Sequence, residues 1–315
     1  MKKSTKRFLF FTAATATTIY AYNKYVDKTA TSKNMLSDDN GSYFEWKYGD
    51  VFYTKRGNGE PILLLHDLDP ASSSFEWAKV IHKLEKNYTV YTMDLPGCGR
   101  SAKPALTYTN YMYVQLITSF VKEVIKEKTS LVATNLSSTV AITSNSMNPD
   151  LFHQIVLVNP PSLDSMREIT DYVCKTKFYL LSIPFAGTFL YNLLMNPKRI
   201  SRFFTMRYFS KEQLIPTNME DVYYESAHLN HSNGRYLLAS ILGRYMNMDI
   251  SHTLSNSKTN IHIIASRELK GNIPNINQYL AINKDIDVTY LSDVKLLPQL
   301  ETPDKFISVL KKNLQ

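Results

Sequence analysis

The stretch Asp94-Leu-Pro-Gly-Cys-Gly-Arg-Ser101 decides the fold class, together with the apolar run Thr89–Met93 that leads into it. Its two glycines permit tight backbone turns with positive φ. Its terminal Asp94 and Ser101 can hydrogen-bond the amides of such a loop. We therefore assign these side chains a structural role, in a turn that follows a buried strand.

Outward from this turn, short apolar runs alternate with segments of helical spacing. The predicted strands are Tyr43–Tyr48, Val51–Lys55, Ile62–His66, Thr89–Met93, Ser130–Thr134, Gln154–Asn159, Ile261–Ser266 and Val288–Leu291. The predicted helices are Phe75–Leu84, Tyr111–Lys128, Leu136–Asn148, Asn275–Ile282 and Pro303–Asn313. This alternation predicts an α/β fold with a doubly wound, mostly parallel sheet.

The alternation stops over residues 165–257, which are rich in aromatic residues, Met and Leu. Helical stretches such as Tyr179–Asn192 and Arg235–Asn247 occur there, and strand signals are few. The sequence thus predicts a helical cap at 165–257, inserted into one α/β core formed by residues 36–164 and 258–315.

The N-terminal segment carries most of the positive charge. Residues 1–35 hold a net charge of +6 of the chain's +8, and the uncharged run Phe8–Tyr22 follows the basic residues 1–7. This layout predicts an uncleaved signal anchor, then a polar linker at 27–41, with the folded domain outside the cytoplasm. The run is shorter than the roughly 20 residues of a membrane span. A cleaved signal peptide of a secreted protein, or a surface helix of a cytoplasmic one, therefore remains open.

The composition argues against several classes of protein. The basic charge lies on the N-terminal segment, which favours a membrane surface over nucleic acid as a partner. Cys98 and Cys174 are predicted to be free thiols. No His, Cys and Asp spacing favours a metal site, and no phosphate-binding glycine loop is evident, so no cofactor is expected. A small-molecule ligand remains the other expected partner, and nothing indicates the oligomeric state.

Three segments carry a family resemblance: Gly57–His66, Asp94–Ser101 and Asn159-Pro160-Pro161. In order and spacing they resemble the α/β-hydrolase superfamily, nearest to its capped proline-iminopeptidase-like and haloperoxidase-like members. The resemblance implies a pocket beneath the cap and a Ser-His-Asp triad, with the nucleophile on a strained strand-to-helix turn, usually Gly-x-Ser-x-Gly.

The triad positions can be read from this chain. Ala133 and Ser137 stand where the flanking glycines belong, so the nucleophile position falls on Asn135, and counting back from Asn148-Pro149 gives the same residue. The acid position falls on Leu269, with Glu268 beside it.

The histidine position falls on Leu296, and no histidine follows His262. The oxyanion and pocket positions are His66, Asp67 and Leu136, and Asp67 replaces the family's glycine. A carboxylate about 4 Å from a developing oxyanion would oppose it by roughly 4 kcal/mol at an effective dielectric of about 20.

Two functions follow. The first is a protein without the standard triad that keeps a capped pocket for a small ligand, an apolar one being favoured by the cap's composition. The second is an active ester or amide hydrolase with a displaced nucleophile, Ser137 or Ser138, and His66, His228 or His231 as base. In either case Asn135 could donate a hydrogen bond to a bound carbonyl.

Overall fold

The computed structural model describes residues 3–37 and 41–314, and it is built around one eight-stranded sheet with the order β1-β2-β4-β3-β5-β6-β7-β8. The strands are β1 (Ser42–Phe44), β2 (Val51–Arg56), β3 (Glu60–Leu65), β4 (Tyr88–Met93), β5 (Thr129–Thr134), β6 (Phe152–Val158), β7 (Asn260–Ser266) and β8 (Asp287–Leu291). Strands β3 to β8 pair in parallel with one another. Strand β2 pairs antiparallel with both β1 and β4. The predicted α/β sheet is therefore confirmed.

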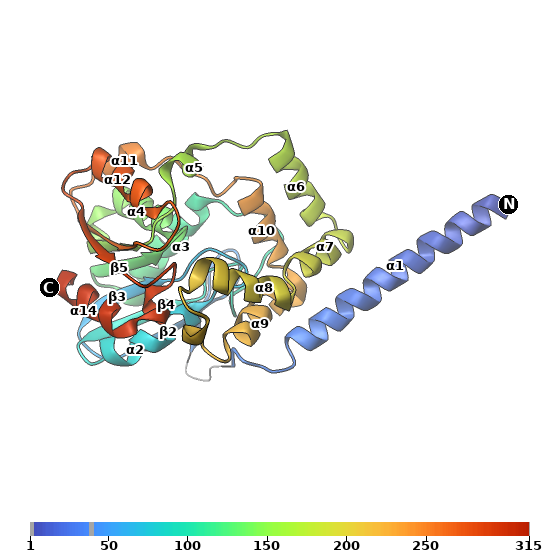
Figure 1. Cartoon of the computed structure of the whole chain (residues 1–315), viewed down its shortest axis with the longest axis horizontal. Coiled ribbons are helices and arrows are strands. Elements are labelled where there is room, and N and C mark those ends of the chain that lie inside the picture. The colour runs from blue at the N-terminus through green and yellow to red at the C-terminus, as the bar shows by residue number, and fades with distance from the viewer. Residues whose placement is uncertain (1–2, 38–40, 315) are drawn as a thin grey trace.

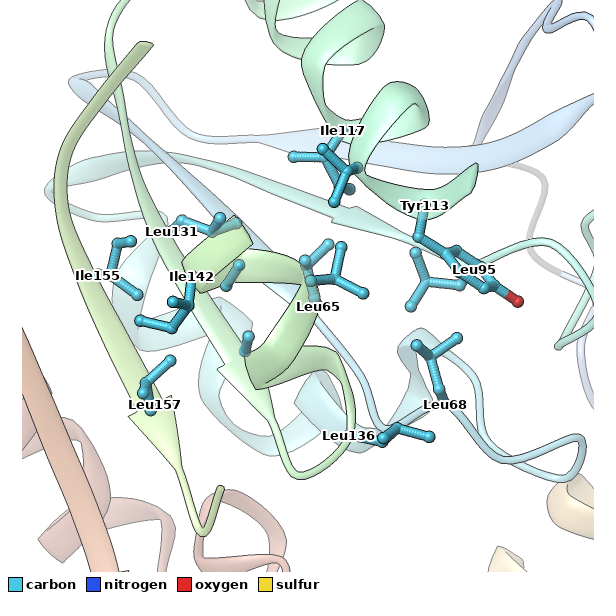
Figure 2. Close-up of a cluster of buried hydrophobic side chains, with 14 of the residues drawn as sticks. Leu65, Leu68, Leu95, Tyr113, Ile117, Leu131, Leu136, Ile142, Ile155 and Leu157 are labelled. Atoms are coloured by element: carbon cyan, nitrogen blue, oxygen red, sulfur yellow. The ribbon is translucent and has the colours of Figure 1, made fainter. Parts of the chain in front are cut away.

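Both faces of the sheet are buried, which explains the continuous apolar runs of its strands. Leu63 and Leu65 of β3 point into one apolar cluster, and Ile62 and Leu64 point into the cluster on the opposite face. Figure 2 shows part of the first cluster, where side chains from three central strands meet those of α3 and α4.

Helices cover the two faces as a doubly wound sheet requires (Figure 1). On the face of the first cluster lie α3 (Asn110–Phe120), α4 (Ser137–Met147) and α12 (Asn272–Ile282). On the other face lie the short 3-10 turn Ser74–Trp77, α2 (Ala78–Leu84) and α14 (Pro303–Asn313), which α13 (Pro298–Glu301) precedes. Because the central strands are parallel, their carboxyl ends share one edge of the sheet, where sites of this architecture form.

Between β6 and β7 the described chain contains helices and turns but no strand. This helical insert comprises α5 (Leu163–Arg167), α6 (Tyr172–Ser182), α7 (Ala186–Leu194), α8 (Pro197–Phe203), the π-type turn Phe204–Tyr208, the 3-10 turn Glu212–Leu214, α9 (Met219–Ser232), α10 (Arg235–Leu242) and α11 (Ser251–Ser255). Its apolar cluster continues into the core through Ala71, Leu296 and Leu300, so the insert packs onto the carboxyl edge of the sheet.

The N-terminal segment differs from its prediction. A single helix, α1 (Lys3–Ala30), runs through the start of the expected linker, and its N-terminal part projects from the body (Figure 1). Its C-terminal half packs on α7 and α9, where Val26 is buried and the Tyr22 and Phe189 rings meet edge to face at 5.3 Å.

Polar contacts continue this docking beyond the helix. Asp27 pairs with His231, Lys33 pairs with Asp221, and Glu225 accepts hydrogen bonds from the amides of residues 35 and 36. The polar composition of residues 27–37 thus reflects contacts to the insert rather than a free linker, and the rest of the expected linker, 38–40, lies outside the described residues.

Across residues 3–37 and 41–314, no helix combines the length and the apolarity that crossing a bilayer requires. The predicted spanning signal anchor therefore finds no support. The physical reason lies in the sequence of α1, where threonines dilute the apolar run and Asn23 and Lys24 end it.

Candidate functional site

The turn between β5 and α4 has the geometry of a strained elbow. Asn135 lies there with φ of 45°, a region that residues other than glycine seldom adopt and that Asn tolerates best. Its amide donates to the Val158 carbonyl (2.9 Å), and its carbonyl accepts from the Ser138 amide (2.9 Å). Ala133 and Ser137 on either side are fully buried, so small side chains are required there.

The carboxylate of Asp67 fills the space in front of this elbow. Its Oδ1 accepts from the backbone amide of Leu136 (3.1 Å), and its Oδ2 accepts from Nδ2 of Asn135 (2.9 Å). The Leu136 amide opens helix α4, where amides and the helix dipole favour an anion. The protein therefore places its own anion at the position assigned from the sequence to an oxyanion.

The backbone amide of Asp67 is also engaged, since it donates to Oε2 of Glu76 (3.1 Å). Oε1 of Glu76 accepts from the hydroxyl of Tyr223 in the insert (3.2 Å). Burial raises the pKa of Glu76 to about 8, and the negative charge of Asp67 contributes to that rise. Two buried carboxyls whose like charges repel in this way favour a state in which one is protonated and the other is charged.

Several groups around Asp67 favour a negative charge on its carboxyl group. Burial raises the pKa of Asp67, whereas the charge of Arg207 and the hydrogen bonds from Asn135, Leu136 and Leu68 oppose the rise. The neighbouring Asp69 has its pKa raised by burial to about 6. The site is thus an acidic cluster with Arg207 as its facing cation.

The positions predicted from the sequence for the acid and the histidine carry apolar side chains. Leu269 follows β7 and packs against the insert's apolar cluster, while the exposed Glu268 accepts from the Val294 amide (3.4 Å). Leu296 is buried in the same cluster, and its amide donates to the Arg207 carbonyl (3.3 Å). Neither leucine can hold or accept a proton.

Asn159 is a residue that sequence reasoning missed as part of this site. It directly follows β6 with φ of 47° and is buried. Its Oδ1 accepts from the Ser266 amide (2.7 Å) and from Asn272 (2.9 Å), and its Nδ2 donates to the carbonyls of Lys295 and Leu296 (3.0 Å each). One side chain thus fixes the loops after β6, β7 and β8. The one feature of the sequence that could have indicated this role is an Asn that follows a buried strand and precedes two prolines.

The hydroxyls of the two serines considered as displaced nucleophiles both donate hydrogen bonds to backbone carbonyls. Ser137 Oγ donates to the His66 carbonyl (2.5 Å), and Ser138 Oγ donates to the Ala133 carbonyl (3.3 Å). Both residues have no exposed surface.

The histidines considered as bases lie in other surroundings. Nε2 of His66 accepts from the Leu95 amide (2.9 Å), Nδ1 faces the Asp67 carbonyl (2.6 Å), and burial lowers the His66 pKa to about 4. His228 hydrogen-bonds the Tyr224 carbonyl, and His231 is exposed beside Asp27. Among the described hydrogen bonds, none joins a histidine side chain to the hydroxyl of Ser137 or Ser138, so the structure does not assemble the displaced pair.

Two cavities meet at Arg207. A polar cavity of about 370 Å³ is lined by Asn135, Asn159, Leu269 and Lys295 among others. A second cavity of about 210 Å³ is lined by Asp69 and Ala71 of the core and by apolar residues of α7, α8 and α10. The site can therefore accommodate a small molecule with an apolar part.

The loop Asp94–Ser101 forms the predicted tight turn after β4. The Asp94 carboxylate accepts from the Arg100 amide of this loop (2.8 Å), as predicted, whereas Ser101 Oγ accepts from the Phe52 amide of β2 (2.8 Å). Gly97 and Gly99 have positive φ values, and the Asp94 carboxylate accepts from Nε of Arg100 (2.7 Å). Burial alone would raise the pKa of Asp94, but Arg100 outweighs it and holds this pKa at about 2.

Comparisons with known proteins agree with this architecture. Residues 59–247 match the alpha/beta hydrolase fold family. The chain is 28% identical over 127 residues to 2-hydroxy-6-oxo-6-(2'-aminophenyl)hexa-2,4-dienoic acid hydrolase of Metapseudomonas resinovorans, a match covering 38% of this chain and 44% of that protein. The chain thus spans less than half the length of the curated relatives it matches.

Solved structures are similar over more of the chain. A probable hydrolytic enzyme from Pseudomonas aeruginosa PAO1 superposes with a TM-score of 0.71 at 14% identity, covering 87% of this chain and 94% of that one. A membrane phospholipase A, described as a bacterial virulence factor, covers 100% of this chain and 98% of its own with a TM-score of 0.66 and 14% identity. Since the family match extends over more than half of its residues and the sheet has the corresponding topology, this chain belongs to the alpha/beta hydrolase fold family.

Proposed function

We propose that this protein lacks the hydrolytic activity of its family and binds a small apolar ligand beneath the helical insert. The observation that carries the proposal is the Asp67 carboxylate, which accepts hydrogen bonds from Leu136 and Asn135 at the elbow. In an active enzyme of this kind, donors at such a turn must be free for charge that develops on the substrate.

The energetic consequence is large. A fixed carboxylate about 4 Å from a developing oxyanion opposes it by roughly 4 kcal/mol at an effective dielectric of about 20. That energy corresponds to about a thousandfold in rate. The carboxylate also occupies the Leu136 amide itself, so a substrate oxygen would have to displace it.

The groups for covalent chemistry are also lacking at their expected positions. Asn135 has little chemical basis as a nucleophile, and Leu296 cannot serve as a base. Loss of nucleophile and base costs about six orders of magnitude in a well-studied serine protease. The activity remaining there relied on an intact oxyanion hole.

The cavity beside Arg207 supports the ligand. Its lining includes Leu194, Ile200, Phe204 and Leu242, so apolar side chains would surround a bound molecule. Its volume of about 210 Å³ limits the occupant to a short chain or a single ring.

The named relatives include a haloalkane dehalogenase and a soluble epoxide hydrolase, so an active hydrolase is the natural competing function. In this chain that function would need Ser137 or Ser138 as nucleophile. The burial of both hydroxyls and their bonds to backbone carbonyls count against it.

Labelling with a broad fluorophosphonate probe tests the absence of activity. We expect no labelling of the purified chain and no turnover of a panel of esters and amides, while a known serine hydrolase is labelled in the same reaction. Labelling that disappears in Ser137→Ala or Ser138→Ala would overturn the proposal and establish the displaced nucleophile.

A further inference from the structure

The insert contains a second basic segment. Residues 172–211 hold seven Lys and Arg residues and no Asp or Glu. These seven positive charges and the net +6 of residues 1–35 together exceed the net charge of +8 of the whole chain. The rest of the protein therefore carries a net negative charge. The positive charge is therefore concentrated on α1 and on the α6–α8 side of the insert.

Helix α6 has its apolar face toward solvent. Tyr172, Tyr179, Leu180 and Ile183 recur at helical spacing, and with Val173 beside them they are 45–85% exposed. We call these five residues the α6 stripe. Lys175 and Lys177 are exposed on its two margins.

The opposite face of α6 is already occupied by the protein's own packing. Cys174 and Leu181 are buried, and Phe178 meets the Tyr245 ring edge to face at 4.9 Å. Helix α6 therefore packs on the protein through its other face, and the α6 stripe is a separate apolar surface.

Further apolar side chains are exposed on the neighbouring helix α7, namely Phe185 at its start and Leu193 near its end. Helix α6 lies at the outer edge of the insert, and α1 projects beyond α7 on the same side of the molecule (Figure 1). Soluble proteins seldom leave so many large apolar side chains exposed in one region without a partner.

We propose that the α6 stripe and its flanking lysines form a docking surface for an anionic lipid bilayer. Tyrosine and phenylalanine suit the boundary between headgroups and acyl chains, and lysines at the margins can reach the headgroups while their stems lie along apolar surface. The absence of acidic residues from 172–211 matches a negatively charged lipid surface. Such docking is peripheral and needs no spanning helix.

The test is sedimentation of the full chain with vesicles of phosphatidylcholine alone or with about one third phosphatidylglycerol. We expect binding to the anionic vesicles that weakens as salt rises from about 0.05 to 0.5 M, because screening shortens the reach of the charges. With about 1 kcal/mol for each lysine at an anionic surface, the double variant Lys175→Gln/Lys177→Gln should bind about 30-fold more weakly.

Matched variants separate this surface from general charge and exposure. Lys122→Gln/Lys128→Gln removes two exposed lysines far from α6 in the sequence, and Tyr111→Ser removes an exposed aromatic of α3. We expect neither to change vesicle binding, whereas Tyr172→Ser/Tyr179→Ser should reduce it at least tenfold. All substituted side chains are exposed, and circular dichroism checks that each variant is folded.

Three results would overturn the proposal. The first is wild-type protein that fails to sediment with anionic vesicles. The second is equal binding by the α6 variants and the controls, which would leave α1 as the lipid-binding element. The third is a change from dimer to monomer in the Tyr172→Ser/Tyr179→Ser variant without vesicle binding, which would make the stripe a contact between two copies of this chain.

Discussion

Asp67 is a charged residue that the fold tolerates because its carboxylate is surrounded by donors. The Leu136 amide and the Asn135 side chain contact its two oxygens, and Arg207 contributes opposite charge. Hydrogen bonds to a charged group are worth about 1.5–3 kcal/mol each, which offsets part of the cost of burying the carboxylate, although burial still raises its pKa. The same bonds hold Asn135 and the start of α4 in their strained turn.

The pKa of Glu76 leads to a prediction about pH. Burial raises this pKa from 4.5 to about 8, so the folded state binds a proton more tightly than the unfolded state. The stabilisation is complete below the unfolded pKa and is lost as pH rises through about 8. We expect the free energy of unfolding to fall between pH 6.5 and 8, by at most about 1.4 kcal/mol per pH unit.

Urea unfolding of wild type and Glu76→Gln across this window checks the prediction. The Gln variant keeps the shape of the side chain without its proton equilibrium, so its stability should be flat where that of wild type falls. The buried histidines His66 and His228 have pKa values lowered to about 4, and burial also lowers the pKa of His262, so all three change stability only below this window. Parallel curves for the two proteins would contradict the assignment.

At the scale of elements, much of the core was predictable from the sequence. The central residues of β3 and β5 are apolar on both faces, which is typical of a buried parallel strand. The small residues Ala133 and Ser137 indicated the elbow at Asn135. The strand expected at Tyr43–Tyr48 is shorter, Ser42–Phe44. The helix expected at Tyr111–Lys128 passes into a π-type turn that ends before Lys126, whose φ is 63°.

Contacts between distant parts of the chain could not be predicted. The bond from Asn135 to Asp67 joins residues 68 apart, and Asn23 meets Phe185 across 162 residues. No local periodicity encodes such pairs. The sequence therefore predicted Asn135 as the elbow residue, but not that the Asp67 carboxylate accepts from the Leu136 amide or that α1 docks on the insert.

The docking of α1 gives a prediction at this scale. Val26→Glu places a charge in the buried contact between α1 and α9, so the segment from residue 22 to residue 37 should detach while the sheet remains folded. Trypsin should then cleave at Lys24, Lys28 or Lys33 at least tenfold faster than in wild type. Ala16→Glu, on the exposed part of α1, is the control and should leave the cleavage rate at Lys28 unchanged.

At the scale of the whole molecule, the apolar cavity joins the two parts of the chain. Asp69 and Ala71 of the core line this cavity, and its other lining residues belong to the insert. A ligand that bridges both parts should stabilise the folded protein against unfolding, by about 2.7 kcal/mol at a concentration 100 times its dissociation constant.

Thermal unfolding with 1-octanol as the probe checks this expectation. Leu242→Trp places a larger ring at the cavity wall and should abolish the rise in midpoint that octanol produces in wild type. Ile273→Trp, a half-exposed position on α12, is the matched control and should respond like wild type. An equal response in all three proteins would place the octanol elsewhere.

Asn159 has a consequence for a ligand that extends into the polar cavity, which Asn159 lines. Its side chain fixes the loops after β6, β7 and β8 through four hydrogen bonds, and these loops carry Leu269 and Leu296. The walls of the polar cavity are therefore ordered before a ligand arrives, and association does not have to immobilise them. We expect preorganisation of this kind to give the site a shape that selects among ligands by fit rather than by adapting to each.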